Sequence, residues 1–257
     1  MSDADTAFDA FQPYYDIMVD WDRRLAREGP FFQRSLAAVS AQRVLDCACG
    51  TGHHVRQMAR WGLDAVGSDL SPAMIEAARR LAREEGAAVR FEVADFRRLP
   101  ETFTQPFDAV VCTGNSLPLA ASPDGLREAV ASMRDVLRPD GLLILGCLNF
   151  ERIPEGRTLV QDPRVRQVDD REILFLKILR KIRRRCDLSI VVLEKVGSQW
   201  TKVEAHDTLW AVRREELEAM LAEAGFGRLQ RYGGYELKPF DPATSPDLIL
   251  VARKAKE

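Results

Sequence analysis

Apolar residues in the first half of this chain follow two alternating periods. Short apolar runs recur at 44–46, 64–68, 89–93, 107–112 and 142–148. Between these runs, apolar residues return every third or fourth position, which is the spacing of a helix with one buried face. Strands that alternate with helices in this way predict an α/β fold, in which a mostly parallel sheet is covered by helices on both faces.

Capping and turn residues mark several boundaries of these elements. Ser71-Pro72 and Ser122-Pro123 each combine a capping serine with a proline in the first helical turn, and both predict a helix start. The segment 137–141 contains Pro, Asp and Gly in succession. It predicts a turn that leads into the strand at 142–148.

The alternation of helices and strands stops between residues 149 and 211. Three extended, partly alternating segments are expected in this interval, at 173–182, 188–196 and 200–209. We interpret 149–211 as an antiparallel insertion that lies over the active-site edge of the sheet. It would supply either a lid over a substrate or an oligomer surface.

The two ends of the chain have patterns of their own. Residues 8–39 alternate aromatic and charged side chains, and Gly29-Pro30 is expected to separate two helical stretches. After the insertion, 215–224 has the pattern of an amphipathic helix that Gly225 closes. Two strands, at 228–237 and 247–253, are expected to follow it.

Length and composition agree with one globular α/β domain that carries an insertion. The 257 residues are 46% hydrophobic, which is enough for a sizeable core. The formal net charge of −2 gives no general attraction to nucleic acid or to an anionic membrane. No apolar run approaches the roughly 18 residues of a membrane span, and the first residues are acidic where a secretory signal would be basic. We therefore expect a soluble protein.

The five cysteines do not have the pattern of a disulfide framework. Four of them fall on or beside predicted buried strands, so a reducing cytoplasm is the simplest location. A metal site would need Cys47, Cys49, His53 and His54 as ligands, but their spacing is not that of the usual zinc sites. No metal is expected.

A turn of small residues follows the first predicted strand and precedes a helix. We call this segment, residues 46–52, the glycine loop. In parallel α/β sheets this is where ligands bind. Gly50 and Gly52 would let the backbone pass close to a ligand, and Asp46 at the strand end would accept a hydrogen bond from an ammonium group. The dinucleotide pattern G-x-G-x-x-G does not fit, because its glycines would fall on Ala48, Gly50 and His53.

Acidic and polar residues also follow the later strands. Asp69 ends the second strand, about 20 positions after the glycine loop, where a carboxylate can accept both hydroxyls of a ribose. Asp95 follows the third strand. The fourth strand leads into a loop that begins at Thr113 and contains Gly114-Asn115-Ser116.

These motifs resemble those of a known enzyme family. The sequence D-x-A-C-G-T-G at 46–52 resembles the first motif of class I S-adenosylmethionine-dependent methyltransferases, in the spelling seen in glycine N-methyltransferase and related small-molecule enzymes. Ala48 stands where the commoner spelling has glycine. Residues 114–116 are similar to the G-N-S segment of glycine and sarcosine N-methyltransferases. They differ from the N-P-P-Y motif of enzymes that methylate amide or base nitrogens.

The resemblance implies a fold and a cofactor. The fold would be a Rossmann-like, doubly wound sheet of seven mostly parallel strands, with a helical cap over residues 1–40 and a methyltransferase domain over 41–257 that contains the insertion at 149–211. The cofactor would be S-adenosyl-L-methionine, with Asp69 at the ribose and Asp95 at the adenine amine. The cofactor-binding positions it implies are Arg24, Asp46, Ala48, Gly50, Gly52, Asp69, Leu70, Asp95, Phe96 and Thr113.

The implied reaction is methyl transfer to a small molecule, most simply at an amine nitrogen. Direct displacement requires positioning and exclusion of water, and an oxygen or carbon acceptor would also need a base. Tyr14, Tyr15 and Asn115 are candidates for orienting the substrate by hydrogen bonds. The aromatic residues of the cap are equally explained by packing on the sheet, and the histidines by structural or solvent-facing roles.

Two other interpretations of the sequence remain open. A basic cluster, defined as Arg180, Lys181, Arg183, Arg184 and Arg185, is explained by a solvated strand face or by a site for an acidic substrate such as RNA or a protein. The G-N-S segment at 114–116, which is expected to face the methyl group, argues against a nucleic-acid partner. A protein that binds S-adenosylmethionine without catalysis would have the same binding motifs. The expected partner is a small molecule, with a homo-oligomer as a further possibility.

Overall fold

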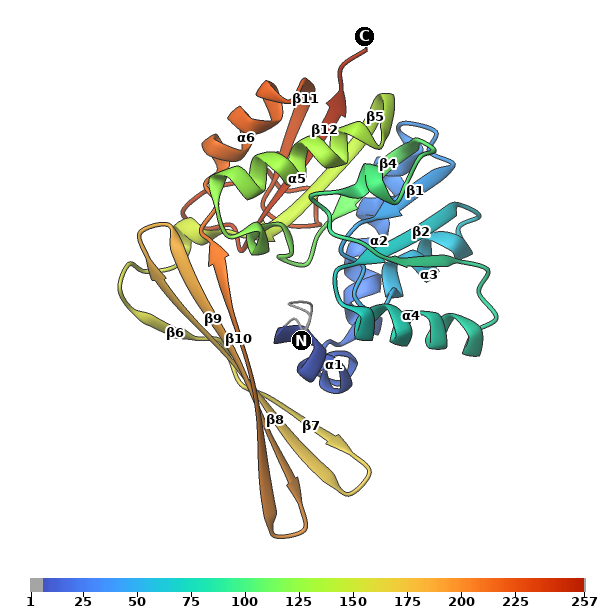
Figure 1. Ribbon diagram of the computed structural model, residues 1–257. Helices are drawn as coiled ribbons and strands as arrows, with labels where there is room; N and C mark the ends of the chain where they lie inside the picture. Colours follow the sequence, from blue (N-terminus) through green and yellow to red (C-terminus); the bar gives the residue numbers. More distant parts are fainter. Residues whose placement is uncertain (1–6, 257) are drawn as a thin grey trace.

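The computed structural model describes residues 7–256, which contain two β-sheets (Figure 1). The central sheet has the strand order β11-β12-β5-β4-β1-β2-β3. All neighbours are parallel except β12, which is antiparallel to both β5 and β11. The predicted seven-stranded, mostly parallel sheet is confirmed. Its strands are β1 (Arg43–Asp46), β2 (Asp64–Asp69), β3 (Arg90–Val93), β4 (Phe107–Cys112), β5 (Leu137–Leu148), β11 (Phe226–Tyr232) and β12 (Asp247–Lys254).

Helices cover both faces of the central sheet, because its strands are apolar on both sides. In β1, Val44 packs with α2, α3 and α4 on one face, whereas Leu45 packs with α5 and α6 on the other. This alternation is the period of a strand that is buried twice. The helices are α2 (Trp21–Ala37), α3 (His53–Arg60), α4 (Pro72–Glu84), α5 (Pro123–Asp135) and α6 (Arg214–Glu223), with short 3₁₀ turns at Leu99–Glu101, Leu117–Ala120 and Phe150–Arg152.

The second sheet is antiparallel and stands beside the central one, with α1 (Ala7–Met18) between them (Figure 1). Its inner face packs against α1, where Phe11 and Met18 meet Phe175, Ile190 and neighbouring apolar side chains. The predicted antiparallel insertion is therefore present. Its strands are β6 (Thr158–Val160), β7 (Arg164–Val168), β8 (Arg171–Ile182), β9 (Arg185–Val196) and β10 (Gln199–Trp210).

Three predicted boundaries are wrong, and one of them is the strand expected at 228–237, which is β11 and ends at Tyr232. Gly29-Pro30 does not separate two helices but lies inside α2, and the chain breaks instead before Asp20, whose side chain accepts from the Arg23 N–H at 3.1 Å. Burial of Phe31 and Phe32 outweighs the one hydrogen bond that proline removes. The segment 137–141 is not a separate turn but the start of β5, with a register shift against β4.

Gly52 illustrates how the sheet fixes the glycine loop. Its φ of +77° is left-handed, and a Cβ there would lie 2.5 Å from the ring of Phe91 on β3. The close approach of the loop to the sheet therefore requires glycine. Gly62 has a similar φ of +84°, but nothing lies within 4 Å of a Cβ at that position.

This pair gives a matched prediction. Gly62→Ala should destabilise the protein by about 1 kcal/mol, because only the left-handed backbone is strained. Gly52→Ala should lose about 3 kcal/mol, because the ring of Phe91 must also move. Urea unfolding of both variants measures the difference. Equal losses would show that contact with Phe91 does not determine the residue at position 52.

Candidate active site

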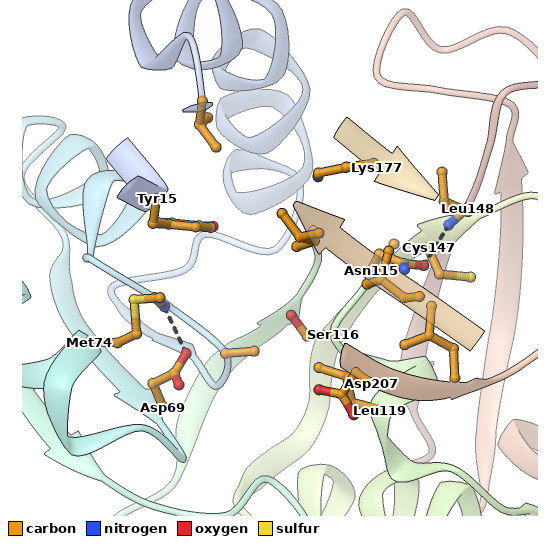
Figure 2. A pocket seen from close by; sticks show the side chains of 18 of the residues that line it. Tyr15, Asp69, Met74, Asn115, Ser116, Leu119, Cys147, Leu148, Lys177 and Asp207 are labelled. Carbon is orange, nitrogen blue, oxygen red and sulfur yellow. Dashed lines mark hydrogen bonds between the residues drawn. The ribbon is translucent and has the colours of Figure 1, made fainter. Parts of the chain in front are cut away.

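A cavity of about 580 Å³ lies where the carboxyl ends of the central strands meet α1, α2 and the inner face of the second sheet (Figure 2). Its volume is in the range of sites that hold a small organic ligand. The loops after β1, β2, β3 and β4 all reach it, as expected for a parallel sheet. The predicted site residues that line it are Tyr15, Arg24, Ala48, Gly50, Asp69, Leu70, Asp95, Phe96 and Asn115.

The Asp69 carboxylate holds the glycine loop in place. One oxygen accepts from the Gly50 N–H at 2.8 Å, and the other accepts from the Ser71 N–H at 3.0 Å. These two bonds join the loop after β1 to the end of β2 and the start of α4. A carboxylate has further lone pairs beyond these two bonds, so Asp69 can still receive a donor from the cavity.

Tyr15 lies directly over this loop. A Cβ on Gly50 would be 3.3 Å from the Tyr15 ring, and the φ of Gly50 is +53°, so glycine is needed for both reasons. Burial raises the pKa of Tyr15 to about 12, against the opposing charge of Arg24. The tyrosine hydroxyl therefore keeps its proton at neutral pH.

Arg24 enters the cavity from α2 and belongs to a buried charged cluster. Its Nε donates to Glu28 at 3.1 Å, and a Cβ on Gly114 would lie 3.2 Å from its Nη2. Glu28 also accepts from Arg27 at 2.8 Å and lies 3.0 Å from His54 Nε2. Burial alone would raise the pKa of Glu28, but His54 and the arginines outweigh it and lower that pKa to about 2.

Asp46 is buried without such partners. It is 3% exposed, and its only hydrogen bond within residues 7–256 comes from the Ala48 N–H at 3.4 Å. Burial raises the pKa of Asp46 to about 7. It lies behind the loop rather than in the cavity wall, and a cation brought to the loop would favour its charged form.

Asp95 and Phe96 line the cavity after β3. Both oxygens of Asp95 bond to Arg97, whose backbone N–H donates at 2.9 Å and whose Nη2 donates at 2.6 Å. Burial opposes this pairing, but the hydrogen bonds win and lower the pKa of Asp95. The Asp95 carboxylate is therefore charged and already oriented by its neighbour.

Three other predicted site residues lie outside the cavity wall. Tyr14 points away, and its hydroxyl donates to Glu194 of β9 at 2.7 Å. Gly52 serves the packing against Phe91, as described above. Thr113 is buried and lies against the position that a Cβ on Gly146 would occupy.

Sequence reasoning missed Asp16, which joins α1 to the glycine loop. Asp16 accepts from the Thr51 hydroxyl and from the Trp21 indole, both at 2.7 Å. His53 lies 3.2 Å from the same carboxylate and stacks on Trp21 with ring centroids 4.2 Å apart. A lone aspartate in a mixed helix carries no pattern that would have revealed this role.

The second sheet contributes Lys177 and Asp207 to the cavity, and neither was predicted (Figure 2). Strand periodicity alone could not reveal Lys177, because β8 has apolar residues on both faces. Ile173, Phe175 and Leu179 of β8 are buried on the inner face, and Lys177 occupies the same set of alternate positions.

Within residues 7–256 no helix has the length and hydrophobicity of a membrane span, and no group of three His, Cys, Asp or Glu side chains could hold a metal.

The region around the glycine loop is similar in sequence to known proteins. Residues 44–141 match a family described as Methyltransferase domain. This part of the chain is therefore similar to a methyltransferase domain. The matched region includes the loops after β1, β2, β3 and β4, which form one wall of the cavity, whereas Lys177 and Asp207 lie outside it.

The chain spans about half the length of the curated relatives it matches. A glycine/sarcosine N-methyltransferase of Parasynechococcus marenigrum (strain WH8102) is 38% identical over 151 residues, which are 59% of this chain and 54% of the relative. A glycine/sarcosine N-methyltransferase of Halorhodospira halochloris is 34% identical over 56% of this chain and 54% of its own length.

Solved structures extend the similarity of fold beyond residues 44–141. An S-adenosylmethionine-dependent methyltransferase from Clostridium acetobutylicum matches with a TM-score of 0.80 at 17% identity, over 97% of this chain and 100% of that one. The amino pentose methyltransferase CalS10 from Micromonospora echinaspora matches with a TM-score of 0.75 at 24% identity, over 95% of each chain. The second sheet is therefore part of a known arrangement.

The Glu28 cluster yields a prediction for pH dependence. Because its folded pKa of about 2 lies below the usual 4.5, Glu28 contributes stability above pH 4.5 that is lost as the pH falls toward 2. Glu28→Gln should therefore cost about 3 kcal/mol at pH 6. The difference from wild type should shrink by more than half at pH 3.

Urea unfolding at both pH values measures this difference. Glu76→Gln, which removes an exposed carboxylate from α4, is the control and should leave stability unchanged. A Glu28→Gln effect that is the same at both pH values would contradict the charged role of Glu28.

Proposed function

We propose that this protein transfers a methyl group from S-adenosylmethionine to a small-molecule amine. The observation that carries the proposal is the joining of Gly50 and Asp69 at the carboxyl ends of β1 and β2, inside the matched methyltransferase domain and in one cavity with Asn115. The names of the relatives, which are glycine/sarcosine N-methyltransferases, support an amine acceptor.

The proposed cofactor contacts follow the cavity wall. Asp69 would accept from the ribose hydroxyls, and Asp95 from the adenine amine, with Phe96 and the half-exposed Leu70 beside the ring. Arg24 would bind the carboxylate end. Ala48 and Gly50 would lie at the ammonium, whose charge would favour the charged form of the buried Asp46 behind them.

The chain's own residues would position the acceptor and exclude water. When bound, the cofactor supplies an electrophilic methyl group on a sulfonium. The Asn115 Oδ1 accepts from the Leu148 N–H at 3.1 Å, which leaves its Nδ2 as a donor toward the cavity. With its high pKa, Tyr15 acts as a hydrogen-bond partner rather than as a base. The second sheet closes the side of the site that a bare sheet edge would leave open to water.

We predict that Asp69→Ala weakens binding of S-adenosylhomocysteine about a hundredfold, because a charge-assisted pair of hydrogen bonds is lost. Asp64→Ala, at the exposed amino end of the same strand, removes a carboxylate that pairs with Arg43 at 3.3 Å. This control should bind like wild type. Calorimetry compares the two variants, and an Asp69→Ala affinity equal to that of the control would overturn the ribose assignment.

The reaction itself is tested with methyl-labelled S-adenosylmethionine and separate pools of small amines, RNA and protein. Label should appear in the small amines. In the basic cluster, Arg184 pairs with Glu216, Arg185 pairs with Asp187 at 2.7 Å, and Lys181 donates to the Phe150 carbonyl at 2.7 Å. The cluster is not one strand face, because Arg183 and Arg184 form the turn between β8 and β9, but these internal contacts argue against a site for an acidic partner. Label in RNA or protein, or binding without transfer to any pool, would refute the proposal.

We also propose that the protein forms a homo-oligomer through the outer face of the second sheet. The inner face of that sheet is covered by α1, but the outer face presents a continuous apolar surface that belongs to none of the core clusters. Polar residues around it carry both signs, with Glu172 and Glu204 beside Lys195 and Lys202. A second copy can meet such a face without net repulsion. The apolar residues are Val160, Val165, Leu174, Leu176, Ile178, Val191 and Leu193.

Sedimentation velocity tests this surface. Wild type should sediment as a dimer or larger species, and Leu176→Asp should sediment as a monomer, because an unpaired charge would be buried at the interface. Val93→Asp places the same charge at a 45% exposed valine of the central sheet and is the control. A monomeric wild type over the whole concentration range would refute the interface.

A further inference from the structure

One cation in the cavity has no partner in the described part of the chain. Arg24 and Arg27 pair with Glu28, Arg97 pairs with Asp95, and Arg164 donates to the Met18 carbonyl at 3.2 Å. Lys177 lines the same cavity, but within residues 7–256 its side chain makes no hydrogen bond and no ion pair, while its backbone carbonyl accepts from the Gln161 N–H at 2.9 Å. The charge of Lys177 is therefore the one that remains available to a ligand.

The surroundings of Lys177 make an unpaired charge unfavourable. Its neighbours on the inner face are apolar, with Phe175 and Leu179 on β8 and Ile190 opposite on β9. Burial lowers the pKa of Lys177 to about 8, and the positive charges of Arg164 and Arg24 act in the same direction. A half-buried ammonium group among other cations is stabilised when an anion joins it.

The sheet register places the opposite charge well away from Lys177. Asp207 lies two strands across and two residues along the inner face, since Lys177 pairs with Ile190 on β9, whereas Asp207 pairs with Leu188. Strand spacing and rise put the two Cα atoms about 12 Å apart. Leu179, Leu188 and Ile190 form an apolar floor between them. An anion is therefore attracted to the Lys177 end and repelled from the Asp207 end.

A second donor faces the same part of the cavity. Figure 2 shows Asn115 and Lys177 on the same side, with Leu148 next to them. The Asn115 Oδ1 is used by the Leu148 N–H, so its Nδ2 remains a donor. Lys177 and Asn115 together offer a charged and a neutral N–H group, a combination that suits a carboxylate.

We propose that Lys177 binds an anionic group of the methyl acceptor, so that the acceptor is an amine that carries a carboxylate on an apolar body. This inference rests on the proposed methyl transfer and names the class of its substrate. The carboxylate would bind at the Lys177 end of the cavity, and the apolar body would pack on the apolar floor formed by Leu179, Leu188 and Ile190. These three side chains line the cavity beside Lys177, so an acceptor with an apolar body would have a surface to pack on that a minimal amino acid would not use.

The test uses a matched pair of probes, hexanoate and hexanamide, which share an apolar body and differ in charge. Calorimetry on the protein saturated with S-adenosylhomocysteine should show hexanoate binding about tenfold more tightly than hexanamide. Lys177→Met should abolish this preference. Lys177→Arg should keep it, because arginine retains the charge but cannot act as a base at neutral pH.

The control is Lys202→Met. Lys202 lies on the outer face of the same sheet, where it pairs with Glu204 at 3.1 Å, so its loss should leave the preference unchanged. Unchanged affinity for S-adenosylhomocysteine in Lys177→Met shows that this variant is folded. If wild type does not bind S-adenosylhomocysteine, the proposed function fails, and the same probe pair is then measured on the free protein.

Two outcomes overturn the assignment of Lys177. One is a wild type that does not distinguish hexanoate from hexanamide, including the case in which neither binds. The other is a preference for hexanoate that survives in Lys177→Met.

Discussion

The bridge made by Asp69 is the contact on which the arrangement of the site depends. Parallel strands end with backbone N–H groups that no neighbouring strand can satisfy, and Asp69 accepts from two of them at once. This fixes Gly50 close to the end of β2. Because Gly50 has no side chain, Tyr15 can lie on the loop, and the helix that carries Tyr15 also packs against the second sheet. The loop after β1 thus determines the position of α1 and, through α1, the position of the second sheet.

Two buried carboxylates near this loop show how partners decide charge. Glu28 and Asp46 are both almost fully buried, yet Glu28 has an unusually low pKa and Asp46 a raised one. Glu28 has two arginines and a histidine around it, whereas Asp46 receives a single long hydrogen bond from the backbone. Charge therefore joins α2 to α3 through Glu28 and His54, and the loop is left with an acid whose ionisation would respond to a bound cation.

The central sheet could be predicted from the sequence because its strands and helix starts are determined by residues that are adjacent in the chain. The run 107–112 coincides with β4, and the Ser-Pro pairs at 71–72 and 122–123 start α4 and α5, since capping depends only on adjacent residues. Gly29-Pro30 misled the prediction because tertiary burial of the following phenylalanines overrides a local break. The choice between Tyr14 and Tyr15 could not be made, because neighbours on a helix point about 100° apart and only the fold shows which one faces the cavity. Lys177 required knowing which face of β8 is the inner one.

The position of α1 has a kinetic consequence. The Asp16 carboxylate accepts from the Thr51 hydroxyl on the glycine loop, and Tyr15 covers Gly50. Phe11 and Met18 of the same helix pack against the second sheet. Any displacement of α1 that uncovers the glycine loop also separates the helix from the wall that holds Lys177. Opening of the cavity at the glycine loop is therefore coupled, through α1, to opening at the second sheet, so access to these two parts cannot be timed independently.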